Sequence, residues 1–480
     1  MSDRVDAAGL PTELSGVDYL LHRGEANPRT RSGMIGVEIL DCAPDWTRFR
    51  SLFDNVSRRV LRLRQKVVVP SLPTAPARWV VDPDFNLDFH VRRVRVPAPG
   101  GLREVLDLAE VALQSPMDMS RPLWSVTLVE GLADGRAATL MHLSHAVSDG
   151  VGSAEMFGQI YDLERDPPAR SMPPIPVPED LSPGDLTRAG INQLPTALLG
   201  GTRDAIIGAV SVASRAVRNP WALAAEAFDY ARSGTRVVSQ AAEHSPLLRQ
   251  RSLISRTQAL DVRLADLHRA AKAGGGSIND AYLSALSGAL GRYHRELGVP
   301  ISTLPMAIPV NLRAEADPAG GNRFTGVNLA APIGVVDPVE RMRRIRAQMT
   351  ARRDEPAMDL IGSIAPLLSV LPDPVLEKMT ESVVGADVQA SNVAFYPGET
   401  YLAGAKVVRH YGLGPLPGVA MMVVLISRGG QCTVTVRYDR AAVRDEALFT
   451  RCLVEGFDEV LALAGDPIAR CVPASFPAAT

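Results

Sequence analysis

The sequence has few cysteines and no large excess of charge of either sign. Its 480 residues include four cysteines, and none of them belongs to a Cys-x-x-Cys pair: Cys42, Cys432, Cys452 and Cys471. This wide spacing suggests neither a disulfide framework nor a zinc site, and it predicts reduced, intracellular thiols. The formal net charge of −2 gives no indication of a nucleic acid or an acidic substrate as the partner.

Long apolar runs are also missing. No uncharged apolar run approaches the roughly 18 residues that a membrane-spanning helix needs, and the longest convincing run, 419–427, has about the length of a strand. The first six residues are polar and do not resemble a signal peptide. We therefore predict a cytoplasmic protein that does not span a membrane. Peripheral contact with a membrane surface stays open.

The composition is typical of a soluble globular protein, with 46% hydrophobic and 22% charged residues. A chain of 480 residues is too long for one hydrophobic core, which favours two domains. The segment 166–190 is rich in proline and charge, and it predicts a linker. Mixed α/β patterns on either side predict an N-terminal domain over 1–165 and a C-terminal domain over 256–480.

Between the linker and the second domain, 191–255 is predicted to form crossover helices. Its first part, up to about residue 233, consists mostly of Ala, Val, Leu and Arg. An apolar stripe with nearby arginines is also typical of a helix that lies on a membrane surface. A helix packed between domains is the favoured interpretation, because such stripes usually face a core.

Three local patterns predict further elements. Apolar residues at helical spacing predict an amphipathic helix over 45–64. The segment 85–91 is predicted to be extended. Ser277-Ile278-Asn279-Asp280 predicts the capped start of a helix that runs to about residue 297.

One stretch carries residues suited to chemistry. The segment 137–143 is an apolar strand that leads into a polar loop with glycines at 150 and 152, and a helix follows from about Ser153. His145 and Asp149 lie four residues apart in this loop. A strand end holds a side chain rigidly, so His145 is a candidate general base, with Asp149 fixing the loop or the ring. The alternative is a core histidine beside an ordinary Asp-Gly turn.

Further motifs occur in order over most of the chain. They are Leu14-Ser15-Gly16-Val17-Asp18, Asp82-Pro83-Asp84-Phe85-Asn86-Leu87-Asp88-Phe89-His90-Val91, Ser120-Arg121-Pro122-Leu123-Trp124, Ser144-His145-Ala146-Val147-Ser148-Asp149-Gly150, Ser277-Ile278-Asn279-Asp280, Pro309-Val310-Asn311-Leu312-Arg313, Gly321-Asn322-Arg323-Phe324 and Ser391-Asn392-Val393. In this series the chain resembles the bacterial wax ester synthase/diacylglycerol acyltransferase family, of the actinobacterial triacylglycerol synthase type.

The resemblance implies a mixed α/β fold of two chloramphenicol-acetyltransferase-like domains, with the active site in a tunnel between them. Acyl-CoA, a co-substrate, would enter from one side, and diacylglycerol or a long-chain alcohol from the other. The products would be triacylglycerol or wax ester. No cofactor and no metal are expected, because the histidines are scattered and the reaction needs no Lewis acid. Lipidic substrates also imply peripheral association with the inner membrane or lipid droplets.

By the same resemblance, His145 takes the proton of the acceptor hydroxyl as that hydroxyl attacks the thioester. An unperturbed histidine pKa of about 6.5 leaves much of the imidazole neutral near pH 7. Asp149 is expected to shape the loop by pairing with Arg313, and Gly150 belongs to the same substrate-binding loop.

Three further residues receive roles by analogy. Asn279 is a candidate donor to the developing oxyanion or the acceptor, with a helix N-cap as the alternative. Trp124 is expected to line the channel, unless it is a buried structural residue. Asn392 is expected at the domain interface.

One position departs from the family pattern, because Ser144 stands where the family carries the first histidine of His-His-x-x-x-Asp-Gly. In a strand, residues 142 and 144 point to one face and residue 145 to the other, so His142 is no simple substitute. The change leaves the predicted base in place. Two alternatives remain: an acyltransferase with a different acceptor, and a lipid- or acyl-CoA-binding protein with little catalysis.

Overall fold

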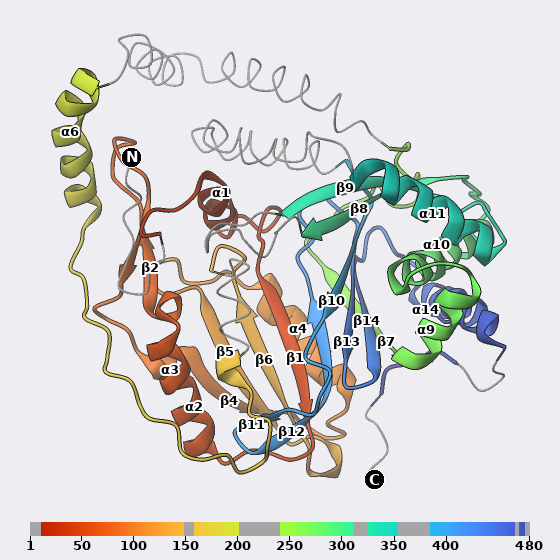
Figure 1. Ribbon diagram of the computed structural model, residues 1–480, viewed down its shortest axis with the longest axis horizontal. Helices are drawn as coiled ribbons and strands as arrows, with labels where there is room; N and C mark the ends of the chain where they lie inside the picture. Colours follow the sequence, from red (N-terminus) through yellow and green to blue (C-terminus); the bar gives the residue numbers. More distant parts are fainter. Residues whose placement is uncertain are drawn as a thin grey trace.

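The computed structural model describes residues 11–147, 158–200, 241–311, 324–353, 385–465 and 470–475. Two β-sheets with helices on their faces lie next to each other, one built mainly from the N-terminal half and the other from the C-terminal half (Figure 1). This arrangement confirms the predicted mixed α/β class. The domain boundaries drawn from the sequence stay a prediction.

The first sheet has six strands in the order β11-β12-β1-β6-β5-β4. Adjacent strands within this sheet are antiparallel, except for β4 and β5, which are parallel. The strands are β1 (Met34–Leu40), β4 (Val91–Arg95), β5 (Trp124–Glu130), β6 (Ala137–Leu143), β11 (Tyr401–Leu402) and β12 (Ala405–Leu413). Two strands from late in the sequence therefore complete a sheet made by the beginning of the chain.

Helices cover both faces of this sheet. Phe49 and Phe53 of α2 (Trp46–Arg59) pack in one core with Leu143 of β6. On the other face, α4 (Leu102–Gln114) packs Val105 against Ile35 of β1 in a second core. Alternate residues of each strand enter opposite cores, as expected for a sheet buried on both sides.

Two local predictions are wrong in detail. The helix predicted over 45–64 ends at Arg59, where Val60 leaves helical geometry, and a short 3-10 helix, η1 (Leu61–Arg64), follows. The segment predicted as extended over 85–91 contains a short helix, α3 (Leu87–His90), because the Asn86 side chain accepts a hydrogen bond from Asp88 N.

A small helix, α1 (Gly16–Gly24), lies near the start of the chain and is capped by Ser15.

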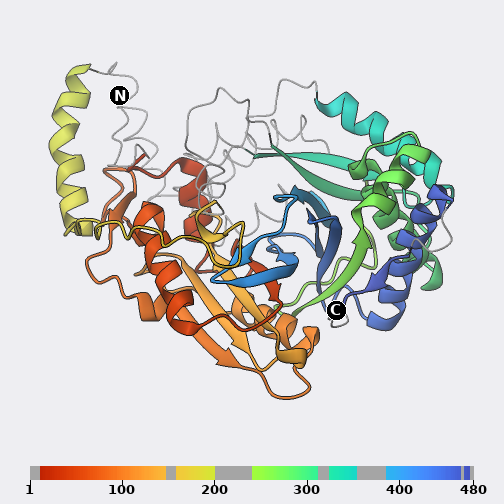
Figure 2. The same ribbon diagram turned by 60° about the horizontal axis from the view of Figure 1, so that its bottom comes forward.

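The second sheet has seven strands in the order β15-β7-β14-β13-β10-β8-β9. They are β7 (Ser255–Arg263), β8 (Leu304–Asn311), β9 (Phe324–Ala331), β10 (Val388–Ala394), β13 (Met421–Arg428), β14 (Gln431–Asp439) and β15 (Val472–Pro473). Four helices lie on its outer side (Figure 2): α9 (Leu264–Ala273), α10 (Ile278–Glu296), α11 (Pro338–Arg353) and α14 (Glu446–Leu461). Helix α10 is buried along most of its length, and its contact with α14 requires Gly456, where a Cβ would lie 2.6 Å from Ala285 O.

The two sheets touch through β12. The hydroxyl of Thr433 in β14 donates to the His410 carbonyl, and the hydroxyl of Thr435 donates to the Gly412 carbonyl. A buried carboxylate, Glu38 of β1, lies 3.9 Å from the Arg428 guanidinium of β13. Burial raises the pKa of Glu38 despite this neighbouring charge. Polar and charged side-chain contacts therefore join the two halves of the protein, in addition to the backbone pairing of β12 with β1.

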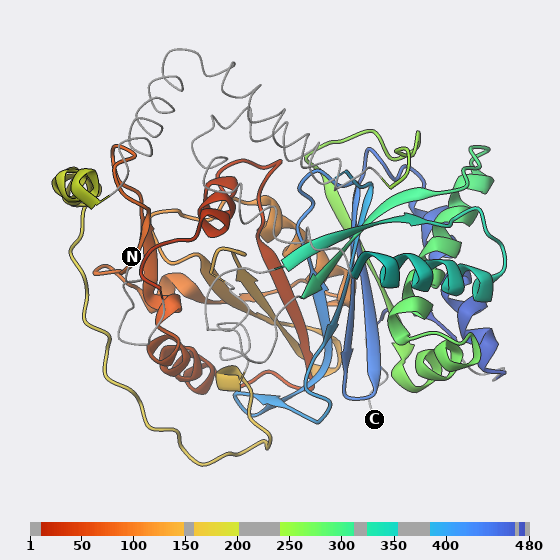
Figure 3. The same cartoon turned by 45° about the horizontal axis from the view of Figure 1, so that its top comes forward.

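A third, two-stranded sheet stands beside the first half: β2 (Gln65–Val68) and β3 (Arg78–Val81). Helix α6 (Pro183–Gly200) starts inside the predicted linker and lies beside β2, at the opposite end of the molecule from α10 and α14 (Figures 1 and 3). The predicted crossover helices lie mostly outside the described residues. In the part of the chain that is described, no helix is both long and apolar enough to cross a membrane.

Candidate active site

His145 lies in the turn that follows β6, one of the central strands of the first sheet. The last residue of β6, Leu143, pairs with Met34 of β1 and Trp124 of β5. Two backbone hydrogen bonds shape the turn, from Ser144 N to Leu123 O at 3.1 Å and from Val147 N to Ser144 O at 3.0 Å. The imidazole is therefore attached to backbone that paired strands hold on both sides.

Burial sets the charge of this imidazole. It lowers the pKa of His145 from its ordinary value of 6.5 to about 4, because removing a cation from water is unfavourable. The ring is then neutral at pH 7 and has a nitrogen lone pair for a proton. Neutrality near pH 7 was expected from the unperturbed pKa, and the surroundings of His145 strengthen it.

Ser144, the residue that departs from the family pattern, is buried and hydrogen-bonded. Its hydroxyl donates to Glu25 Oε1 at 2.9 Å, and the Ser32 hydroxyl donates to the same oxygen at 2.8 Å. The Ser144 hydroxyl also accepts from Ala146 N at 3.2 Å. The hydrogen bonds of Ser144 therefore connect two parts of the chain: the turn that carries His145 and the segment that follows α1.

Glu25 is a residue that sequence reasoning missed. Its side chain is buried, and burial is the largest cause of its raised pKa, opposed by the hydrogen bonds from Ser32 and Ser144 and by the charge of Arg31. Glu25 belongs to none of the motifs in the sequence, and only the folding of the chain brings its carboxylate next to Ser144. We refer to Glu25, Ser32 and Ser144 as the Glu25 cluster.

His142 lies beside the Glu25 cluster, as strand alternation predicts for residues 142 and 144. It is buried, and desolvation lowers its pKa to about 4, with smaller effects of Arg31 and Arg437. Its Nε2 faces Gly33. A Cβ added at Gly33 would lie 2.9 Å from His142 Nε2 and 3.7 Å from Glu25 Oε2. Among the described residues, neither of these two atoms has a hydrogen-bond partner.

This close approach gives a testable consequence at Gly33. Replacing Gly33 with alanine is expected to lower the free energy of unfolding by about 1–3 kcal/mol, because the new methyl group overpacks the site against His142. Chemical denaturation measures the change. Gly158→Ala is the matched control, because a Cβ at Gly158 meets nothing within 4 Å. Equal stability of Gly33→Ala and the wild type would contradict the packing described here.

The structure brings two predicted asparagines together from different elements. Asn392 Nδ2 of β10 donates to Asn279 Oδ1 of α10 across 3.5 Å, the long limit for a hydrogen bond. Asn279 is not the helix cap: the Ser277 side chain accepts from Asp280 N, and the Asp280 carboxylate accepts from Ser277 N at 2.8 Å. The N-cap alternative for Asn279 is therefore wrong, and its side chain is available for another role.

Trp124 starts β5 and is buried. Its Nε1 donates to Leu63 O at 2.7 Å, and its ring stacks on His90 with centroids 4.7 Å apart. His90 Nδ1 lies 2.7 Å from the Trp124 carbonyl, a contact in which the ring nitrogen donates. These contacts suffice for a structural role, and the channel-lining role stays a prediction.

Three predicted site residues, Asp149, Gly150 and Arg313, lie outside the described residues. In the described ranges, no group of three or more His, Cys, Asp or Glu side chains could hold a metal ion. All four cysteines are free thiols, three of them buried.

Comparison with known proteins adds independent evidence. Residues 5–282 match a family model for the wax ester synthase/diacylglycerol acyltransferase catalytic domain, and residues 320–476 match the C-terminal domain model of that family. A Mycobacterium tuberculosis H37Rv protein named "Putative diacyglycerol O-acyltransferase" is 72% identical over 476 residues, which cover 99% of this chain and 97% of the relative.

Solved structures resemble the fold. The wax ester synthase/diacylglycerol acyltransferase from Marinobacter aquaeolei VT8 matches with a TM-score of 0.64 and 20% identity, covering 95% of this chain and 100% of that one. The first condensation domain of the calcium-dependent antibiotic synthetase matches with a TM-score of 0.58 and 14% identity, covering 96% and 97%. These likenesses confirm the predicted fold class.

Proposed function

Because the chain belongs to the wax ester synthase/diacylglycerol acyltransferase family, we propose that it transfers a fatty acyl group from acyl-CoA to a hydroxyl group. The acceptor is diacylglycerol, a long-chain alcohol, or both. The products are triacylglycerol or wax ester and free CoA. Because the acyl donor and the acceptor are both lipidic, the protein works at the inner membrane or the lipid-droplet surface.

His145 is the general base of the proposed reaction. Its neutral imidazole takes the proton of the acceptor hydroxyl as the oxygen attacks the thioester carbonyl, which forms a tetrahedral intermediate. The carbon–sulfur bond then breaks, and the CoA sulfur leaves with the proton that the imidazole returns. A positioned base of this kind contributes about 10²–10⁴-fold to the rate.

One observation carries this assignment: the motif histidine sits at the end of a doubly paired strand and is kept uncharged by burial. A protonated imidazole could not accept the hydroxyl proton, whereas a neutral one can at any pH well above 4. The Glu25 cluster supports the base by fixing the residue next to it.

The side-chain amides of Asn279 and Asn392 are the candidates for stabilising the oxyanion. They meet from two elements of the second half, and amide N–H groups are suitable donors to a developing negative charge. Asp149 is proposed to shape the loop through Arg313, with Gly150 giving the substrate room. Trp124 is retained as a proposed wall of the channel.

The test is product formation by the purified protein. Labelled palmitoyl-CoA is supplied with dioleoylglycerol or with hexadecanol, and both neutral lipid and released CoA are measured. The proposal predicts labelled ester and an equal amount of CoA, and the ratio of the two esters identifies the acceptor. Binding of palmitoyl-CoA with no ester and only background CoA would favour a lipid-binding protein instead.

A further inference from the structure

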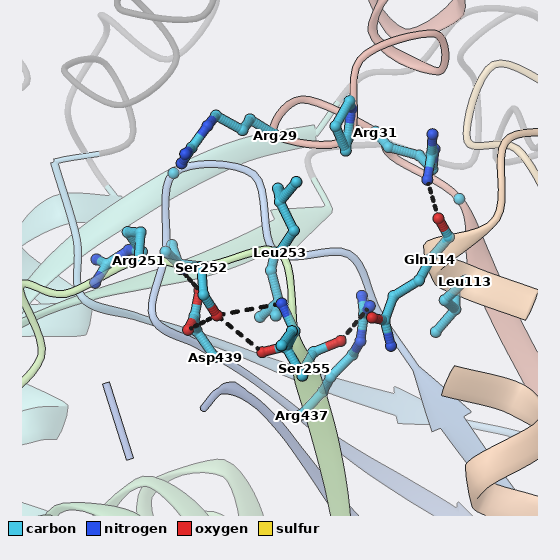
Figure 4. A pocket seen from close by; sticks show the side chains of 16 residues that line it. Arg29, Arg31, Leu113, Gln114, Arg251, Ser252, Leu253, Ser255, Arg437 and Asp439 are labelled. Atoms are coloured by element: carbon cyan, nitrogen blue, oxygen red, sulfur yellow. Dashed lines mark hydrogen bonds between the residues drawn. The ribbon is translucent and has the colours of Figure 1, made fainter. Parts of the chain in front are cut away.

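An arginine-lined cavity lies where the two halves of the protein meet. Its volume is about 240 Å³, and four arginines line it: Arg29, Arg31, Arg251 and Arg437. In the view of Figure 4, Arg29 and Arg251 lie on one side of Leu253, with Arg31 and Arg437 on the other. We refer to this space as the arginine cavity. Its walls come from the segment between α1 and β1, the end of α4, the start of β7 and the end of β14.

Contacts with the protein hold two of these guanidinium groups in place. Arg31 donates from Nη1 to Gln114 O at 2.7 Å and from Nε to Glu25 O at 3.1 Å. Arg437 donates to Ser255 Oγ at 2.8 Å and to Gly414 O at 3.1 Å. Guanidinium groups fixed in this way lose little freedom when a ligand arrives.

The arginines of the cavity outnumber the carboxylates around it. The lining contains one carboxylate, Asp439, which accepts hydrogen bonds from Ser252 N at 2.5 Å, Ser252 Oγ at 2.7 Å and Ala441 N at 2.8 Å. A second carboxylate, Glu110, lies behind Arg437 at 3.2 Å from its Nε. A third carboxylate, Asp387, lies 3.9 Å from Arg251 Nη2. The four arginines therefore exceed these three carboxylates by one positive charge, which favours an anion, and planar guanidinium groups match phosphate oxygens in particular.

The arginine cavity is connected to the candidate active site through the Glu25 cluster. Gly33 is part of its wall and also faces His142 and Glu25. Arg31 bonds the backbone of Glu25, whose carboxylate in turn holds Ser144 beside His145. An anion in the cavity would therefore bind close to the catalytic turn, at a site to which both halves contribute.

We propose that the arginine cavity binds phosphate groups of the coenzyme A portion of acyl-CoA. The assignment rests on the proposed function, because it takes acyl-CoA as the donor. The cavity is too small for the whole co-substrate and large enough for its charged groups, and the exposed Leu253 in its lining offers apolar surface to the nucleoside. The thioester then extends away from this anchor toward His145.

The test uses the full-length protein and Arg29→Gln, because Arg29 is exposed. Calorimetry with adenosine 3′,5′-bisphosphate measures binding without any reaction. We expect this substitution to weaken binding about tenfold, the effect of losing one charge-assisted hydrogen bond. The KM for palmitoyl-CoA should rise similarly, whereas the KM for palmitoyl-pantetheine, which lacks the nucleotide, should not change. Arg95→Gln is the matched control, an exposed arginine on the edge strand β4.

The outcomes separate this assignment from the proposed function. Equal binding of the bisphosphate by Arg29→Gln and the wild type would overturn it. So would a loss of binding to phosphatidylglycerol vesicles with bisphosphate binding unchanged, since the anion would then be a lipid headgroup. If the wild type forms no ester but the bisphosphate still binds through Arg29, the proposed function fails and the phosphate site stands.

Discussion

Replacement of His145 with alanine is expected to lower kcat for ester formation by about 10²–10⁴-fold, the usual contribution of a positioned general base. The residual rate would come from binding and from the oxyanion donors. Labelled ester from palmitoyl-CoA and the better acceptor measures the effect. His145→Gln should lose a similar factor, because glutamine fills more of the space of the imidazole but cannot take up the proton at neutral pH.

His268→Ala serves as the control for this experiment. His268 is exposed on α9, away from the catalytic turn, so its loss should leave kcat at the wild-type value. Thermal unfolding of each variant separates loss of chemistry from loss of fold. A folded His145→Gln protein with wild-type kcat would remove His145 from the mechanism.

Replacement of Glu25 with alanine is expected to have the second-largest effect, on both stability and activity. It removes the acceptor shared by the Ser144 and Ser32 hydroxyls, both of which are buried. Leaving buried hydroxyls unsatisfied should lower the free energy of unfolding by about 2–4 kcal/mol. Since Ser144 precedes His145, kcat should fall as well. Chemical denaturation and the ester assay measure the two effects.

Glu25→Gln is the informative partner of this variant. Its amide oxygen can accept both hydroxyl hydrogen bonds, so most of the stability and kcat lost in Glu25→Ala should be recovered. If glutamine were as damaging as alanine, the role of Glu25 would depend on its charge. If alanine were harmless, the Glu25 cluster would not support the turn at all.

The sequence predicted local features of the fold well where one pattern dominates. The apolar run over 137–143 coincides with β6 (Ala137–Leu143), and the Ser277 signal marks the start of α10. Propensity alone failed at Val60 and at Asn86, where a single residue ends or starts a helix. The placement of β12 beside β1 was beyond reach, because hydrophobic periodicity carries no information on which strands pair.

The residues of the candidate site also differ in whether the sequence alone could predict them. His145 and Asn279 belong to motifs with a recognisable spacing, and the resemblance of the chain to a known family gave them roles. Glu25 and the four arginines of the arginine cavity have no such spacing, since they come from segments up to about 400 residues apart that only the folded chain brings together. Burial also decides the His145 pKa, and burial is a property of the tertiary structure.

The pH dependence of kcat/KM tests the central claim most directly, because it reports the ionisation of the base in the free enzyme. A histidine is active as a base only when deprotonated, so a pKa of about 4 predicts a nearly constant kcat/KM from pH 5.5 to pH 8. Circular dichroism at each pH confirms that the protein is folded. A fall of about tenfold between pH 7.5 and pH 5.5, as an ordinary histidine pKa of about 6.5 would give, would contradict a neutral, half-buried His145 as the base.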